Sequence, residues 1–148
     1  MAIIFNPNKK IFTLQTAHTT YQMQVDRLGY LLHLYYGAKN TCDMDYVLTY
    51  ADRGFSGNPY AAGMNRTYSL DTLPQEYPTL GTGDFRNIAL DIKNEHGTES
   101  VELLYKSHEI RLRSKRQRQP VWILYREILM SCGSTVSMPW SAILSAHT

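Results

Sequence analysis

Alternating apolar and polar positions predict β-strands in the first part of the chain. The alternation is clearest at residues 20–25, Thr-Tyr-Gln-Met-Gln-Val, a period typical of a strand with one buried face. We expect its Tyr, Met and Val to point inward and its Thr and Gln residues to point to solvent. Apolar runs at 2–5 and 11–15 precede this strand, and residues 30–36 follow it as a strand that is apolar on both faces. Short turns separate these runs, so the pattern indicates an antiparallel meander.

The next fifty residues, 37–86, predict little regular structure beyond a short strand at 46–50. Alternation resumes at 87–93, and residues 100–106 are the expected partner strand across a hairpin turn at 94–97. No helix is expected before residue 110. The fold class is all-β, with one or two antiparallel sheets.

Residues 52–71 form a long loop whose side chains suit a ligand. The stretch holds three glycines and an Asn-Pro pair, and it keeps neither a strand nor a helix period. Its aromatic residues Phe55, Tyr60 and Tyr68 offer flat faces, and Asp52 and Arg66 offer hydrogen-bonding groups. Aromatic faces beside charged groups favour a polyhydroxylated ligand, and a tyrosine-rich surface loop is the alternative.

Length and composition limit the possible classes. The chain has 148 residues, which corresponds to one small domain or a piece of a larger protein. Its apolar runs are too short to span a bilayer, and no signal peptide is visible. Cys42 and Cys132 are far apart in sequence, so we expect free thiols in a reducing compartment and a cytoplasmic location.

Several motifs resemble bacterial α-galactosidases of glycoside hydrolase family 36. They are Asp-Arg-Gly-Phe-Ser at 52–56, Arg-Thr-Tyr-Ser-Leu-Asp-Thr-Leu-Pro-Gln-Glu-Tyr-Pro at 66–78, Gly-Thr-Gly-Asp-Phe-Arg at 81–86 and Leu-Tyr-Lys-Ser-His-Glu-Ile at 104–110. The resemblance covers about residues 1–110. It implies the front part of an N-terminal β-supersandwich domain, which in this family precedes a catalytic (β/α)8 barrel and a C-terminal β-domain.

The resemblance also implies a reaction and a role for the loop. The family hydrolyses terminal α-galactosyl residues with retention of configuration, using two aspartates of the barrel and no cofactor or metal. The motifs that surround those aspartates are absent here, so no catalytic residue is expected and the chain alone is expected to be inactive. In tetrameric members this loop enters a neighbouring subunit's active site, which implies sugar contacts for Asp52 and Arg66 and a pocket wall for Phe55. The alternative is that Asp52 caps a turn and Arg66 is a solvated loop charge.

Other candidate chemistry has less support. The five histidines show no metal-ligand spacing, and none is assigned to a metal. Asp43 and Asp45 are expected on one face of an extended segment, a geometry that suits a calcium ion. We favour the alternative that they are a solvated pair. Asp71 and Glu76 have no support as a glycosidase pair beyond being acidic.

The chain changes character after Ile110, where the resemblance stops. Residues 1–110 carry 9 Lys/Arg and 12 Asp/Glu, whereas residues 111–148 carry 6 and 1. We interpret 111–148 as an irregular basic tail of no recognised family, with a short helix over 121–130, produced by a frameshift or a truncated reading frame. Binding of nucleic acid by this basic segment is the disfavoured alternative. The expected function is therefore an α-galactosidase N-terminal domain acting within a homotetrameric parent on galactosides. The alternative is a free-standing carbohydrate-binding or interaction module.

Overall fold

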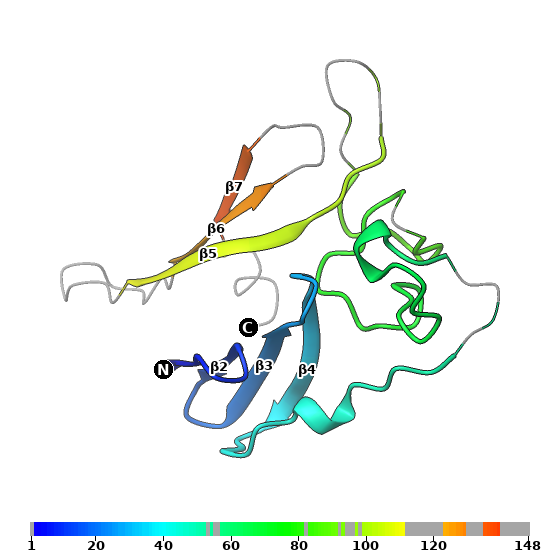
Figure 1. Ribbon diagram of the computed structural model, residues 1–148. Coiled ribbons are helices and arrows are strands. Elements are labelled where there is room, and N and C mark those ends of the chain that lie inside the picture. Colours follow the sequence, from blue (N-terminus) through cyan, green and yellow to red (C-terminus); the bar gives the residue numbers. More distant parts are fainter. Residues whose placement is uncertain are drawn as a thin grey trace.

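The computed structural model describes residues 2–52, 54, 57–81, 83–91, 93, 97, 99–111, 123–129 and 135–139. They form two antiparallel sheets and a large loop region beside them (Figure 1). Within these ranges no helix is long and apolar enough to cross a membrane.

The first sheet is the predicted meander. Its strands are β1 (Ala2–Asn6), β2 (Ile11–Gln15), β3 (Thr19–Val25) and β4 (Leu31–Ala38), in the order β1-β2-β3-β4. Neighbouring strands are antiparallel, with Phe12 opposite Met23 and Leu14 opposite Tyr21. Short turns join strands that are adjacent in sequence, which is why the period alone located them.

The second sheet contains β5 (Leu104–Arg111), β6 (Ile123–Leu129) and β7 (Thr135–Pro139), in that order. The predicted helix over 121–130 is wrong, because residues 123–129 form the middle strand of this sheet. The tail is therefore not irregular throughout. A short apolar run does not distinguish helix from strand by its period, and here pairing with β5 decides the outcome.

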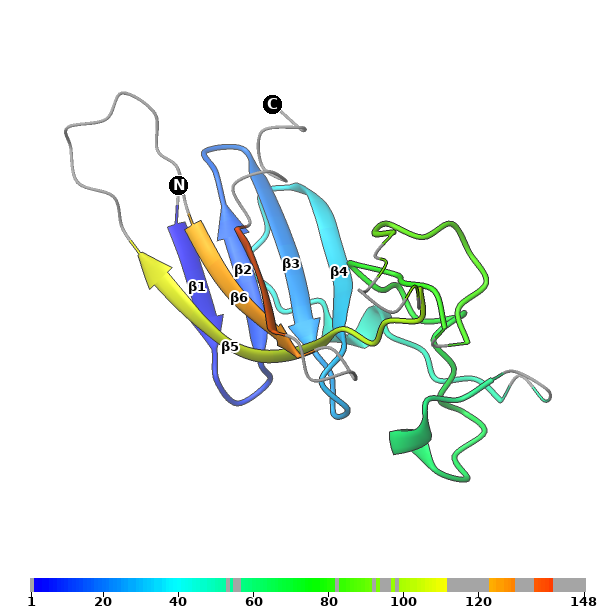
Figure 2. The ribbon, with the colours of Figure 1, turned by 90° about the horizontal axis from the view of Figure 1, so that it is seen from above.

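The two sheets pack as layers, with β5 crossing the face of the first sheet (Figures 1 and 2). The Tyr105 N–H donates to the Gly29 carbonyl at 2.7 Å. The His108 ring lies 4.3 Å from the Phe5 ring and 4.8 Å from the Phe12 ring, centroid to centroid. These contacts confirm the all-β, sandwich-type fold class.

Two hydrophobic clusters lie on opposite faces of the first sheet. The first, between the sheets, is centred on buried residues of β2, β3 and β4: Phe12, Leu14, Met23, Val25 and Leu31. The second joins the start of β4 to the loop region: Tyr30, Leu32, Tyr68, Leu70 and Leu73. Successive residues of a strand point to opposite faces, so Leu31 and Leu32 enter different clusters. The prediction that this strand is buried on both sides is confirmed for residues 30–32.

The polar face predicted for β3 is partly buried. Thr20 is 0% and Gln22 1% exposed, because the segment after β4 folds over them. Gln22 Nε2 donates to the Cys42 carbonyl at 3.0 Å, and the Met44 N–H donates to Gln22 Oε1 at 3.1 Å. The Thr20 hydroxyl likewise donates to the Asn40 carbonyl at 3.1 Å and accepts the Asn40 N–H at 2.9 Å. The alternation correctly predicts that Met23 and Val25 are buried. It cannot reveal that a distant segment supplies polar partners to the opposite face of the strand.

Two predicted strands are absent. Residues 45–47 form the 3₁₀ turn η1 (Asp45–Val47) in place of a strand at 46–50. The described residues of 87–93 form no strand, so the predicted hairpin with 100–106 is wrong. Strand β5 begins only at Leu104 and pairs with β6 instead.

Candidate functional site

The loop between β4 and β5 is anchored by two stacked tyrosines. The rings of Tyr50 and Tyr68 lie 5.9 Å apart at an interplanar angle of 25°. The guanidinium carbon of Arg27 lies 5.8 Å from the Tyr50 ring centroid and 5.3 Å from that of Tyr68, within the range of cation–π attraction. Tyr50 lies two residues before Asp52, and Tyr68 lies two residues after Arg66. We call residues 50–52 and 66–68 the two arms of the loop, and the stacked tyrosines join the bases of these arms.

Tyr68 is also tied to the turn between β3 and β4. Its hydroxyl donates to Asp26 Oδ2. The other oxygen of Asp26 accepts the backbone N–H groups of Leu28 and Tyr30, both at 2.9 Å. Burial first, and then the bond to Asp26, raise the pKa of the Tyr68 hydroxyl well above its usual range, so it remains a donor at neutral pH. Tyr68 is 0% exposed, so the prediction that it offers a flat face to a ligand is wrong, whereas Tyr60 is fully exposed.

Asp52 and Arg66, both predicted as sugar contacts, come together in space. Arg66 Nη2 lies 3.2 Å from Asp52 Oδ1, with the side chains 65% and 51% exposed respectively. The Gly54 N–H donates to the same carboxylate oxygen at 2.8 Å, and Gly54 has a φ of 69°, which suits glycine. Among the described residues these side chains have no other hydrogen-bond partner, so their remaining polar atoms can bond the hydroxyl groups of a sugar. Phe55 lies outside the described residues.

The C-terminal half of the loop is fixed by an ion pair between a buried carboxylate and a partly exposed arginine. The Asp84 side chain is 1% exposed, and Arg86 Nη2 lies 2.6 Å from its Oδ2. The same Arg86 nitrogen donates to the carbonyls of Leu70 and Leu73, each at 2.7 Å. Gln75 forms an isolated antiparallel bridge with Leu32 of β4. The loop is thus attached to the first sheet at several points, which gives the site a fixed support.

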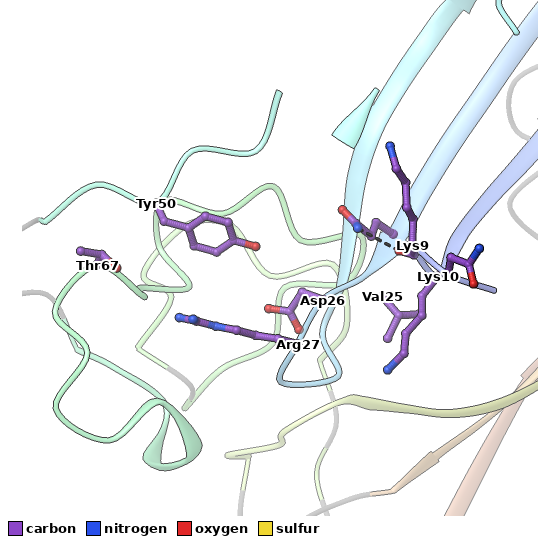
Figure 3. A pocket seen from close by; sticks show the side chains of 9 residues that line it. Lys9, Lys10, Val25, Asp26, Arg27, Tyr50 and Thr67 are labelled. Carbon is purple, nitrogen blue, oxygen red and sulfur yellow. Dashed lines mark hydrogen bonds between the residues drawn. The ribbon is translucent and has the colours of Figure 1, made fainter. Parts of the chain in front are cut away.

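An open cavity of about 440 Å³ adjoins the stack of tyrosines. Figure 3 shows Arg27 extended beneath Tyr50, with Asp26 beside them and Lys9 and Lys10 at the far wall. Sequence reasoning missed Asp26, Arg27 and Tyr50 as supports of the site. The pattern at 26–29 predicts only a turn, and no sequence signal indicates that Asp26 is buried there.

The carboxylates considered for other sites are already bonded. Lys9 Nζ lies 3.5 Å from Asp43 and 3.0 Å from Asp45, so these two residues form an ion-pair cluster with a lysine. Glu76 accepts the hydroxyl of Tyr21 and lies 3.1 Å from His33 Nδ1. Such contacts account for these acidic residues without a metal ion or a reaction.

Comparisons with known proteins agree with the resemblance. Residues 29–129 match the model of the glycosyl hydrolase family 36 N-terminal domain. The chain is 83% identical over 111 residues to the bifunctional α-galactosidase/sucrose kinase AgaSK of Mediterraneibacter gnavus, covering 75% of this chain and 12% of the relative. It is 42% identical over 112 residues to α-galactosidase AgaA of Geobacillus stearothermophilus, covering 74% and 15%. The chain thus spans only a small part of the length of these relatives.

Solved structures give the same result. The galactosidase domain of AgaSK superimposes with a TM-score of 0.75 at 70% identity, covering 87% of this chain and 19% of that one. A variant of AgaA in complex with raffinose superimposes with a TM-score of 0.73 at 32% identity, covering 88% and 20%. The chain belongs to glycosyl hydrolase family 36, and the part described here corresponds to that family's N-terminal domain.

Proposed function

We propose that this chain supplies substrate-binding residues, not the catalytic pair, to an α-galactosidase. Asp52 and Arg66 would hydrogen-bond the hydroxyl groups of a galactoside, and Phe55 would form a wall of the same pocket. The proposal depends chiefly on one observation, the exposed Asp52–Arg66 pair held at 3.2 Å on an anchored loop. A carboxylate accepts and a guanidinium donates, so together they match vicinal hydroxyl groups.

The relatives support the substrate class. AgaSK and AgaA are named as α-galactosidases, and variants of AgaA have been solved with raffinose and with stachyose. We infer that the protein to which this domain contributes acts on galacto-oligosaccharides of this kind.

We further propose that the chain alone hydrolyses no α-galactoside. Retaining hydrolysis requires two carboxyl groups about 5–5.5 Å apart on either side of the glycosidic bond. The carboxylates of Asp26, Glu76 and Asp84 instead accept hydrogen bonds from tyrosine, histidine, arginine and glutamine side chains and from the backbone. A chromogenic α-galactoside is the assay, and turnover lost on mutation of an Asp or Glu of this chain would contradict the proposal.

Substitution in a complete enzyme tests the sugar contacts. Residues 1–111 of this chain would replace the matching part of AgaSK, its 83% identical relative, and Asp52→Ala and Arg66→Ala would be made in that chimaera. Each change should lower kcat/KM for an α-galactoside roughly ten- to a hundredfold, the effect of one lost bond to a charged group. Unchanged kcat/KM in both variants would overturn the proposed contacts.

A free-standing carbohydrate-binding module is the second candidate, and it differs in a measurable respect. Such a module would bind galactose or raffinose by itself, with loss of binding in Asp52→Ala. Titration calorimetry on the 148-residue chain distinguishes the two, because a contributing loop completes its pocket only beside a barrel.

A further inference from the structure

The Asp52–Arg66 pair is too exposed to hold its own geometry. Its side chains are 51% and 65% exposed, and exposed ion pairs contribute little to stability because water competes and both side chains lose freedom. A site that must match several hydroxyl groups nevertheless needs its polar atoms fixed before the ligand arrives. The order of this pair must therefore come from the bases of the two arms.

The base of the arm that carries Arg66 is bonded to one buried carboxylate, that of Asp26. It accepts three hydrogen bonds, from the backbone N–H groups of Leu28 and Tyr30 and from the Tyr68 hydroxyl. The first two bonds belong to the β3–β4 turn and the third comes from the loop, 42 residues away in sequence. One side chain thus connects the rigid sheet to the arm that carries Arg66.

The second arm is held through the first. The Tyr50 ring stacks on the Tyr68 ring, and Arg27 lies over both rings. Tyr50 precedes Asp52 by two residues, and Tyr68 follows Arg66 by two. Movement of the Tyr68 ring would therefore change the spacing between Asp52 and Arg66.

We propose that Asp26 and Tyr68 are positioning residues that set the distance between Asp52 and Arg66 for galactoside binding. Arg27 and Tyr50 transmit the position of Tyr68 to the second arm. This inference rests on the proposed function of Asp52 and Arg66, and it adds residues that touch no substrate.

Tyr68→Phe in the AgaSK chimaera is the direct test, because it keeps the ring and removes only the hydroxyl. The expected result is a rise in KM of about tenfold with kcat nearly unchanged, as for a loss of binding shared by ground state and transition state. Asp26→Asn retains an oxygen for the two backbone donors but leaves only a neutral hydrogen bond to the Tyr68 hydroxyl. It should raise KM in the same direction by a smaller factor, and it replaces Tyr68→Phe if that variant folds poorly. Tyr21→Phe is the matched control. It removes an equivalent bond from a tyrosine to a carboxylate, that of Glu76, and should leave KM unchanged.

A double-mutant cycle separates positioning from general stability. If Tyr68 acts through the pair, Tyr68→Phe raises KM in the unmodified chimaera but adds nothing in a background that carries both Asp52→Ala and Arg66→Ala. An equal effect in both backgrounds, or no effect in the first, overturns the inference. If Asp52→Ala itself has no effect, the proposed function fails and the inference fails with it. If Asp52→Ala is impaired and Tyr68→Phe is normal, only the positioning role fails.

Discussion

At the scale of single residues, some tyrosines are buried and bond a carboxylate, whereas others are exposed to solvent, and composition does not distinguish the two kinds. The hydroxyls of Tyr21, Tyr30 and Tyr68 each donate to a carboxylate, those of Glu76, Glu102 and Asp26 respectively. Burial first, and then these carboxylates, raise the pKa of the three hydroxyls. Tyr60, by contrast, is fully exposed. Only the structure distinguishes a tyrosine that satisfies a carboxylate from one that is free to meet a ligand.

Asp84 provides a prediction about pH. Burial would raise the pKa of its carboxyl, but the hydrogen bonds from Arg86 outweigh burial and lower it. A carboxyl with a lowered pKa in the folded state stabilises the fold above its unfolded pKa of about 3.9, and this contribution disappears as the pH falls through the folded value. Asp84→Asn should lower the free energy of unfolding at pH 7 by about 1.5–3 kcal/mol.

The same difference should shrink as the pH falls below the unfolded pKa of about 3.9. Urea unfolding of the chain from pH 7 to pH 2.5 measures it. Asp91→Asn is the control, because Asp91 is exposed and should show no difference at either pH. A deficit in Asp84→Asn that stays constant across the range would refute the ion pair's role.

At the scale of elements, what the sequence predicted depended on how local the interactions are. Strands β1 to β4 pair with their sequence neighbours, so alternation and turns were sufficient to find them. Strand β6 was assigned to a helix because its identity depends on β5 and β7. The site follows the same rule. The motifs around Asp52 and Arg66 predict two candidate residues, which the structure brings together, whereas Asp26 lies 42 residues from Tyr68 and has no pattern to indicate the contact.

The segment 40–44, which folds over the polar face of β3, gives a prediction at this scale. Gln22→Leu keeps the approximate volume but leaves the Cys42 carbonyl and the Met44 N–H without their side-chain partner. A typical hydrogen bond contributes about 0.5–1.5 kcal/mol net, and the variant loses two part-buried ones, so it should be less stable by about 1–3 kcal/mol. Amide exchange of residues 40–44 should also be faster.

Gln24→Leu on the same strand is the matched control. Its amide donates to the Lys9 carbonyl at 2.9 Å in an exposed setting, where water can replace it, so we expect a change below about 0.5 kcal/mol. Equal losses in the two variants would mean that the segment 40–44 does not depend on Gln22.

At the scale of the whole molecule, the proposed sugar contacts lie where a partner would be needed to complete a pocket. The Asp52–Arg66 pair is open to solvent, and the loop that carries it lies beside the two-layer sandwich, outside the cluster between the sheets (Figures 1 and 2). The chain corresponds to 12% of AgaSK and 15% of AgaA in length. Sugar contacts on this loop are useful only if the loop meets a barrel, either of its own chain or of a neighbouring subunit.

Co-assembly distinguishes those two arrangements. We propose delivery to a neighbour within a homotetramer, so a chimaera with Asp52→Ala and one without its barrel nucleophile would be mixed in the same oligomer. Each is impaired alone, but mixed oligomers contain sites that combine an intact barrel with an intact incoming loop. Activity should then exceed that of either parent, because the two defects lie in different subunits of the repaired site. If the loop serves its own barrel, every site keeps one defect and mixing gives no gain even where mass analysis verifies mixed oligomers.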